Sequence, residues 1–134
     1  MTGNSRHLSR RSINALIVGA TAWLCSRGAL SFLPTTTIKS LLLSILEKPG
    51  SAYAIGSAYL GSLPPHTRAA DHLTNAIVCA SGCDDETMRS KEALRKQISI
   101  RVRKDFAEGA VVIVAGWVLS ETEARLYALA AIGE

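Results

Sequence analysis

Apolar residues recur at helical spacing along most of this chain, with polar or small residues between them. Within residues 38–48 they lie at i, i+1, i+4 and i+5 from Leu41, which is the pattern of a core-facing helix that ends at Pro49-Gly50. The pattern predicts a small, mainly helical domain of about four helices with one short β-hairpin. Helical periodicity covers residues 38–48, 51–63, 67–80, 84–108 and 121–132.

Two of these segments have features that bear on packing. Residues 51–63 are rich in small side chains, including Gly56 and Gly61, and this composition predicts a helix that lets a neighbour approach closely. The segment 84–108 starts with three acids, which favour a helix N-terminus over a calcium site. Its predicted apolar seam consists of Leu94, Ile98, Val102 and Phe106.

The only clear change of period comes after Gly109. The β-branched run 111–114 is followed by Ala115-Gly116 and then by Trp117-Val118-Leu119, which predicts a hairpin over residues 111–119. Ser120 and Glu123 have the spacing of a capping box, so a last helix is expected over residues 121–132.

The first 31 residues have the layout of an export signal. A basic start is followed by an apolar core over residues 13–25, which is shorter than the roughly 20 residues that span a bilayer. The small-x-small rule for cleavage is met by Ala29-Leu30-Ser31. We therefore expect residues 1–31 to be a signal peptide or an uncleaved N-terminal anchor helix, and residues 32–134 to be a single small domain.

The residues around the arginine pair resemble a twin-arginine (Tat) signal. The match consists of Ser9, Arg10, Arg11 and Ile13, and Arg27 behind the apolar core also resembles Tat signals because a positive charge there works against the general secretion route. The resemblance implies export to the periplasm, contact with the Tat machinery during export, and association with the inner membrane if the segment is kept. The alternative is a basic arm before a buried helix.

The charge distribution also differs between the N-terminal segment and the rest of the chain. The net charge of the whole chain is +4, but from Gly28 onward there are equal numbers of basic and acidic residues. A neutral exported part argues against nucleic-acid binding, which requires a basic surface on the folded domain.

Few residues are candidates for chemistry. Cys79 and Cys83 are four residues apart, and in an oxidising compartment this spacing favours a disulfide between them. Two unpaired buried thiols, or a metal or redox site that includes His72, are the alternatives. No catalytic motif or cofactor-binding loop is present, and no metal site or cofactor is predicted.

The segment 116–126, Gly-Trp-Val-Leu-Ser-Glu-Thr-Glu-Ala-Arg-Leu, resembles the tail of small proteins with Tat signals that accompany membrane-bound dehydrogenases. The resemblance implies a larger partner subunit, such as a flavin or haem dehydrogenase, and docking through Trp117, Arg125 and Tyr127. The alternative interpretation is that the hairpin only holds the C-terminal helix in place.

These observations favour a non-catalytic accessory subunit or assembly factor of a Tat-exported redox enzyme. Two other classes stay open. One is an independent periplasmic thiol or metal-binding protein, and the other is a membrane-anchoring protein with an uncleaved N-terminal helix.

Overall fold

The structure is a computed structural model in which residues 33–46 and 49–133 are described. This part contains five α-helices, two short 3₁₀ turns and one two-stranded antiparallel sheet. The prediction of a mainly helical domain with one hairpin is therefore confirmed, although the helices number five rather than about four. The predicted N-terminal helix lies outside the described residues.

The first two helices are separated just before Pro49, which was expected to end the helix over residues 38–48. Helix α1 spans Thr35–Ser44, and α2 spans Pro49–Ser62 and begins with the proline itself. Proline is well suited to the first position of a helix because its missing N–H would have no partner there. Pro49 therefore starts α2, whereas α1 has already ended at Ser44, before the predicted end at residue 48.

Helix α3 spans Ala70–Ser81 and ends at Gly82, which has a left-handed conformation with φ of +63°. The chain then forms a 3₁₀ turn, Thr87–Arg89, before α4 begins. Helix α4 spans Lys91–Glu108, and the Ser90 side chain accepts a hydrogen bond from the Ala93 N–H at its start.

The expected start of the fourth helix at Asp84 is therefore wrong. The Asp84 carboxylate accepts hydrogen bonds from the backbone N–H and the hydroxyl of Thr87, at 2.8 and 2.6 Å. These bonds close a local turn, which competes with helix formation at Asp and Thr residues. The helix starts only where Ser90 supplies an N-cap.

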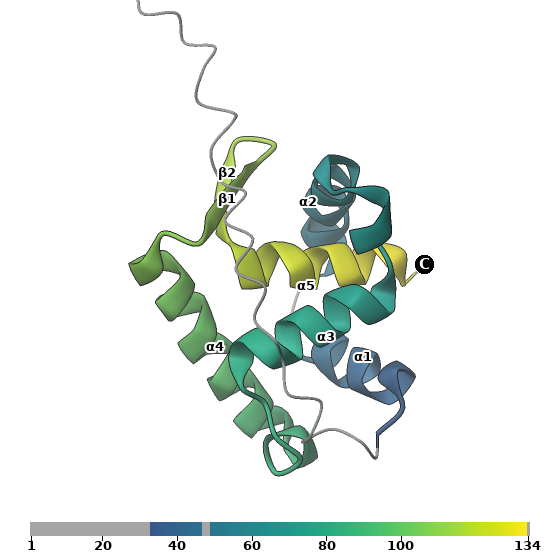
Figure 1. Cartoon of the computed structure of the whole chain (residues 1–134), viewed down its shortest axis with the longest axis vertical. Helices are drawn as coiled ribbons and strands as arrows, with labels where there is room; N and C mark the ends of the chain where they lie inside the picture. Colours follow the sequence, from purple (N-terminus) through teal and green to yellow (C-terminus); the bar gives the residue numbers. More distant parts are fainter. Residues whose placement is uncertain (1–32, 47–48, 134) are drawn as a thin grey trace, which may run out of the picture.

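The hairpin joins α4 to the last helix, with β1 at Val111–Val114 and β2 at Trp117–Ser120. Helix α5 spans Glu121–Ile132, and its capping box is formed as predicted by Ser120 and Glu123. In Figure 1, α5 crosses the middle of the molecule, with α2 on one side, α1 and α3 on the other, and α4 beside the start of α5.

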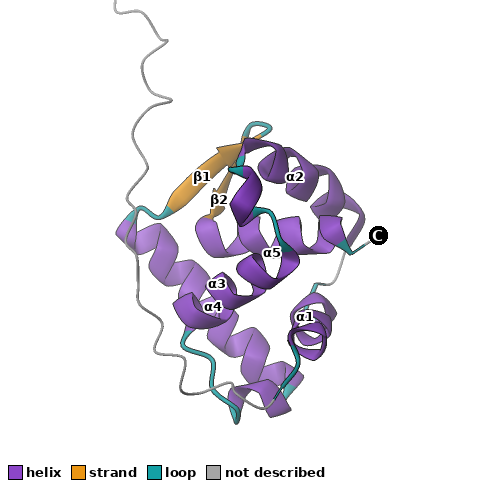
Figure 2. Cartoon of the chain, turned by 45° about the vertical axis from the view of Figure 1, so that its right-hand side comes forward, coloured by secondary structure: helices purple, strands orange, loops and turns teal. Residues whose placement is uncertain are grey.

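All five helices and both strands contribute to one core. Its larger buried side chains include Leu42, Tyr59, Leu73, Ile77, Leu94, Ile98, Val114, Leu119, Leu126 and Leu129. Figure 2 shows the hairpin at one end of this helical body, with the end of β1 and the turn beside α2. Val114, the last residue before the turn, belongs to the core, so the hairpin is held near its turn as well as at its base.

Helices α2 and α5 approach each other most closely. The Cβ of an alanine at position 56 would lie 2.0 Å from the Tyr127 carbonyl oxygen, and Ala52 and Ala128 are also buried. A glycine therefore lets the two backbones touch, which confirms the close approach predicted from the small residues of α2.

Candidate docking site on the hairpin

The turn of the hairpin places both of its central residues in the left-handed region. Ala115 has φ of +49° and Gly116 has φ of +85°. Two-residue hairpin loops with two positive φ values are type I′ turns, whose twist matches the twist of the paired strands. The turn sets the register, in which Ile113 pairs with Val118 and Val114 pairs with Trp117.

Buried contacts fix this hairpin at both ends. Val114, next to the turn, and Leu119, near the base, are 6% and 7% exposed and belong to the core. The N–H of Ala110 donates to the carbonyl of Asp105 at 2.8 Å, and the N–H of Glu121 donates to the carbonyl of Ala110 at 3.0 Å. The strands are therefore tied at one end to the C-terminus of α4 and to the start of α5.

A buried carboxylate strengthens this junction. Asp105 is 1% exposed, and its Oδ2 accepts a hydrogen bond from the Thr122 N–H at 3.0 Å. Its Oδ1 accepts a hydrogen bond of 2.7 Å from Arg101 Nε. The carboxylate thus binds the positive N-terminus of α5 and a guanidinium at the same time, which satisfies a charge that burial would otherwise penalise.

The tip of the hairpin is apolar and exposed to solvent. Ile113, Trp117 and Val118 are 76%, 62% and 58% exposed, and we call these three residues the hairpin tip. The cross-strand pair Ile113 and Val118 shares one face of the ribbon. No residue from 109 to 120 carries a charge. Trp117 pairs with Val114 and therefore lies on the other face, at the end of the ribbon. Large exposed apolar side chains gathered in one region mark interaction surfaces more often than scattered ones do.

The structure separates the three residues predicted to dock a partner. Trp117 lies at the exposed hairpin tip, whereas Tyr127 is half-buried, with its backbone against Gly56 of α2. Arg125 pairs with Glu121 one turn earlier on α5 and lies beside the phenol of Tyr59. The three residues therefore do not form one surface, and only Trp117 belongs to the candidate docking site.

Arg125 instead lines a small cavity of about 200 Å³ that is open to solvent. Its other polar lining residues include Tyr59, Thr67, His72 and Glu121. Burial raises the pKa of the Tyr59 phenol, and the Arg125 guanidinium opposes part of that rise. The cavity is smaller than the roughly 300 to 1,000 Å³ typical of ligand pockets, so it is a poor site for a cofactor.

The two cysteines of the C-x3-C motif are not bonded to each other. Cys83 is a free, buried thiol, whereas Cys79 is exposed and in a disulfide that does not involve Cys83. The reason is the left-handed Gly82, after which the Cys83 N–H donates to the Val78 carbonyl at 3.2 Å. This helix-ending motif turns the residue after the glycine back toward the helix core. The predicted Cys79–Cys83 disulfide is therefore corrected.

Burial raises the pKa of the Cys83 thiol to about 11, and the nearby Asp84 adds to the rise. A thiol with such a pKa is almost entirely protonated at neutral pH, and a protonated thiol is a poor nucleophile and a poor metal ligand. Among the described residues there is also no group of three or more histidine, cysteine, aspartate or glutamate side chains that could hold a metal ion. His72 lines the small cavity and, within the described part of the chain, is not part of a metal-binding cluster.

The export-signal residues Ser9, Arg10, Arg11, Ile13 and Arg27 lie outside the described residues, so their role stays a prediction. Within residues 33–46 and 49–133, no helix is both long enough and apolar enough to cross a membrane.

The chain matches no protein-family model, and neither a curated protein nor a solved structure is significantly similar to it.

The sequence interpretation missed two members of the hairpin tip. Ile113 and Val118 were expected only as strand residues, although the charge-free stretch 109–120 was visible in the sequence. That stretch alone does not show which face of a hairpin the helices cover. The burial of Val114 and Leu119 identifies the opposite, exposed face.

Proposed function

We propose that this protein is a small, non-catalytic accessory subunit or assembly factor that docks onto a larger exported redox enzyme through the hairpin tip. The carrying observation is the exposure of Ile113, Trp117 and Val118 on a hairpin that Val114 and Leu119 hold against the core. Three large apolar side chains in water cost free energy that docking would recover, since burying one of them fully contributes about 1.5 to 3 kcal/mol.

The attachment of the hairpin to the core supports docking as the role of the hairpin tip. A preformed surface loses less conformational entropy on binding than a flexible one, so more of the contact energy appears as affinity. Tryptophan near the centre of such a surface is also typical of residues that dominate binding energy. The export route and the redox nature of the partner rest on the Tat-like residues Ser9 to Ile13 and on the tail that includes Trp117.

The alternative of a thiol or metal-binding protein is less well supported. Cys83 is buried with a raised pKa, and its position at the end of α3 explains that burial as packing. The anchor alternative depends on residues before the described part of the chain.

The test is purification of a tagged full-length chain from its native host, with mass spectrometry and absorption spectra of what co-elutes. We expect a larger subunit in stoichiometric amount, with flavin or haem absorbance. The triple variant Ile113→Thr/Trp117→Thr/Val118→Thr should lose this subunit while keeping its circular dichroism spectrum, because threonine preserves strand propensity.

The matched control removes exposed apolar surface elsewhere. Ile100 and Phe106 of α4 are 48% and 47% exposed, so the variant Ile100→Gln/Phe106→Gln should retain the larger subunit. Elution of the wild-type chain alone would contradict the accessory role. Retention of the partner by the folded triple variant would contradict docking through the hairpin tip.

A further inference from the structure

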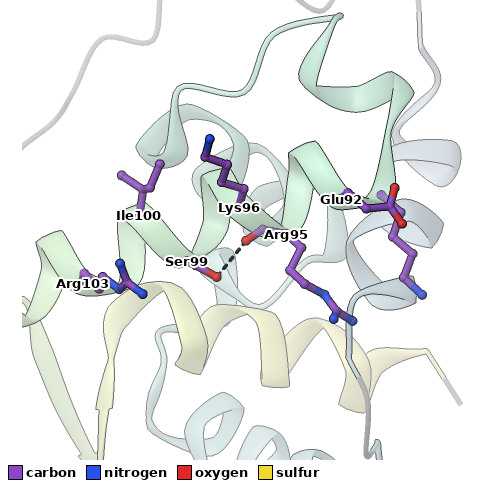
Figure 3. Close-up of a pocket in the computed structure, with 7 residues that line it drawn as sticks. Glu92, Arg95, Lys96, Ser99, Ile100 and Arg103 are labelled. Carbon is purple, nitrogen blue, oxygen red and sulfur yellow. Dashed lines mark hydrogen bonds between the residues drawn. The ribbon is translucent and has the colours of Figure 1, made fainter.

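A second surface lies on α4, away from the hairpin tip. It is a shallow hollow of about 560 Å³, and all the residues that line it belong to α4 (Figure 3). Its four basic lining residues are Lys91, Arg95, Lys96 and Arg103. Glu92 is the one acid that accompanies them, so this face of the helix carries a clear excess of positive charge.

Two of these basic residues have no acidic partner. Lys96 and Arg103 form no ion pair with any other residue in the described part of the chain. By contrast, Arg101 and Lys104 on the same helix each form an ion pair with Glu108. The cations near the end of α4 are thus neutralised by an acid of the same helix, whereas Lys96 and Arg103 are not.

An apolar residue projects from the middle of this basic face. Lys96, Ile100 and Arg103 are spaced at i, i+4 and i+7, so they lie along one stripe of the helix. Ile100 is 48% exposed between the two cations, and Phe106 near the end of the helix is 47% exposed. The stripe therefore offers positive charge on either side of an apolar side chain.

We propose that this face of α4 binds an anionic phospholipid surface. A membrane is flat, and a single straight helix of 18 residues, about 27 Å long, can lie along it. Lysine and arginine reach phosphate head groups while an isoleucine between them enters the boundary with the acyl chains. Juxtaposed basic residues gain attraction to anionic leaflets in proportion to their number.

Other anionic ligands fit the surface less well. A small molecule or a bound peptide needs walls from more than one element, and this hollow has only one helix. Nucleic acid requires a net basic domain, whereas the chain from Gly28 onward is neutral. The lipid surface does not depend on the proposed partner of the hairpin tip, because the two surfaces share no residue.

The experiment measures binding of the full-length chain to vesicles of phosphatidylglycerol mixed with phosphatidylcholine. Because the basic residues before Gly28 can also attract such vesicles, the readout is an environment-sensitive fluorescent amino acid at Ser99 of α4. A probe at Asn75, which is exposed on α3, serves as the reference. We expect a blue shift at Ser99 and none at Asn75, with loss of the shift in pure phosphatidylcholine or high salt.

The variant Lys96→Gln/Arg103→Gln should weaken the binding reported by Ser99 about thirtyfold, because two of the surface cations are lost. The control Lys39→Gln/Arg68→Gln removes the same charge from α1 and from the connection before α3, and should change binding less than about twofold. Melting curves check that both variants fold.

Three outcomes would overturn the proposal. The first is vesicle binding with no change at Ser99, which would place the contact elsewhere. The second is equal weakening by the two variants, which would reduce the effect to net charge. The third is a shift at Ser99 with polyglutamate or DNA but not with vesicles, which would assign the surface to another anion.

Discussion

At the residue scale, the least expected feature of this protein is a buried aspartate in place of a buried phenylalanine. The apolar seam predicted for α4 included Phe106, but that side chain is 47% exposed and Asp105 is 1% exposed. From hydrophobicity alone, Phe106 would be buried and Asp105 would be exposed. The carboxylate is buried because the start of α5 and Arg101 both supply hydrogen bonds to it. Arg101 lies one turn earlier on the same helix, but the contact with the start of α5 could not be assigned from the local sequence.

Asp105 is therefore expected to contribute strongly to stability. Asp105→Asn keeps the shape of the side chain but removes its charge, and we expect a loss of about 2 to 3 kcal/mol in the free energy of unfolding, measured by urea denaturation. The control is Glu108→Gln, which removes the same charge from an exposed partner of Arg101 and should cost less than about 0.5 kcal/mol. Similar losses for the two variants would contradict the role assigned to Asp105.

Cys83 is expected to make stability sensitive to alkaline pH. Its pKa rises from 9.0 to about 11 in the folded protein, so the folded state holds the thiol proton more tightly than the unfolded state does. This contribution is complete below about pH 9 and is lost as pH rises toward 11, for a total of about 3 kcal/mol.

The measurement is the free energy of unfolding of the wild type and of Cys83→Ala from pH 8 to 10.5. Tyr59 and Tyr127 also have raised pKa values and remain in both proteins, so the difference between the two curves isolates the thiol. Parallel curves across this range would show that the thiol is not protected by burial.

At the element scale, helices α2 and α5 are joined by backbone contact rather than by large side chains. Small residues in α2 predicted that some neighbour would come close, but they could not identify α5, which lies more than sixty residues further along the chain. Two of the three glycines of α2, Gly56 and Gly61, also looked equivalent in sequence. Only the packing distinguishes them, since Gly56 touches Tyr127 and Gly61 has nothing within 4 Å of its would-be Cβ.

This difference gives a matched pair of variants. Gly56→Ala should destabilise the protein by about 3 kcal/mol, because its Cβ would collide with a backbone carbonyl that cannot rotate away. Gly61→Ala should be neutral or stabilising by up to about 1 kcal/mol, because alanine favours the helix. Thermal melts of the two variants check the prediction, and equal shifts would show that α2 and α5 do not touch at Gly56.

At the scale of the whole molecule, one core joins all five helices and the hairpin base. Its buried residues run from Ile38 in α1 to Leu129 in α5 without division into separate clusters. The two proposed surfaces lie on different elements: one at the hairpin tip and one along the outer face of α4. A single rigid body of this kind would hold a partner protein and a membrane in a fixed relation to each other.

One core implies one unfolding transition. With increasing urea, circular dichroism at 222 nm and the reactivity of Cys83 with a thiol reagent should change at the same midpoint, because the thiol becomes accessible only when the core opens. A Cys83→Ala variant, in which the labelling should be absent, serves to confirm that Cys83 is the residue being labelled. Reaction of Cys83 well before the loss of helix would reveal a separately unfolding part around the end of α3.

The sequence by itself determined the local structure: the helical segments, the hairpin with its turn at Ala115-Gly116, and the capping box of Ser120 and Glu123. These depend on hydrophobic periodicity, on the backbone conformations that each residue prefers and on contacts between residues close in the chain. All three can be read from short stretches of sequence. The tertiary structure decided which glycine touches another helix, that Asp105 rather than Phe106 is buried, and that Cys83 turns away from Cys79. It also decided which face of the hairpin remains exposed, because burial depends on segments that only folding brings together.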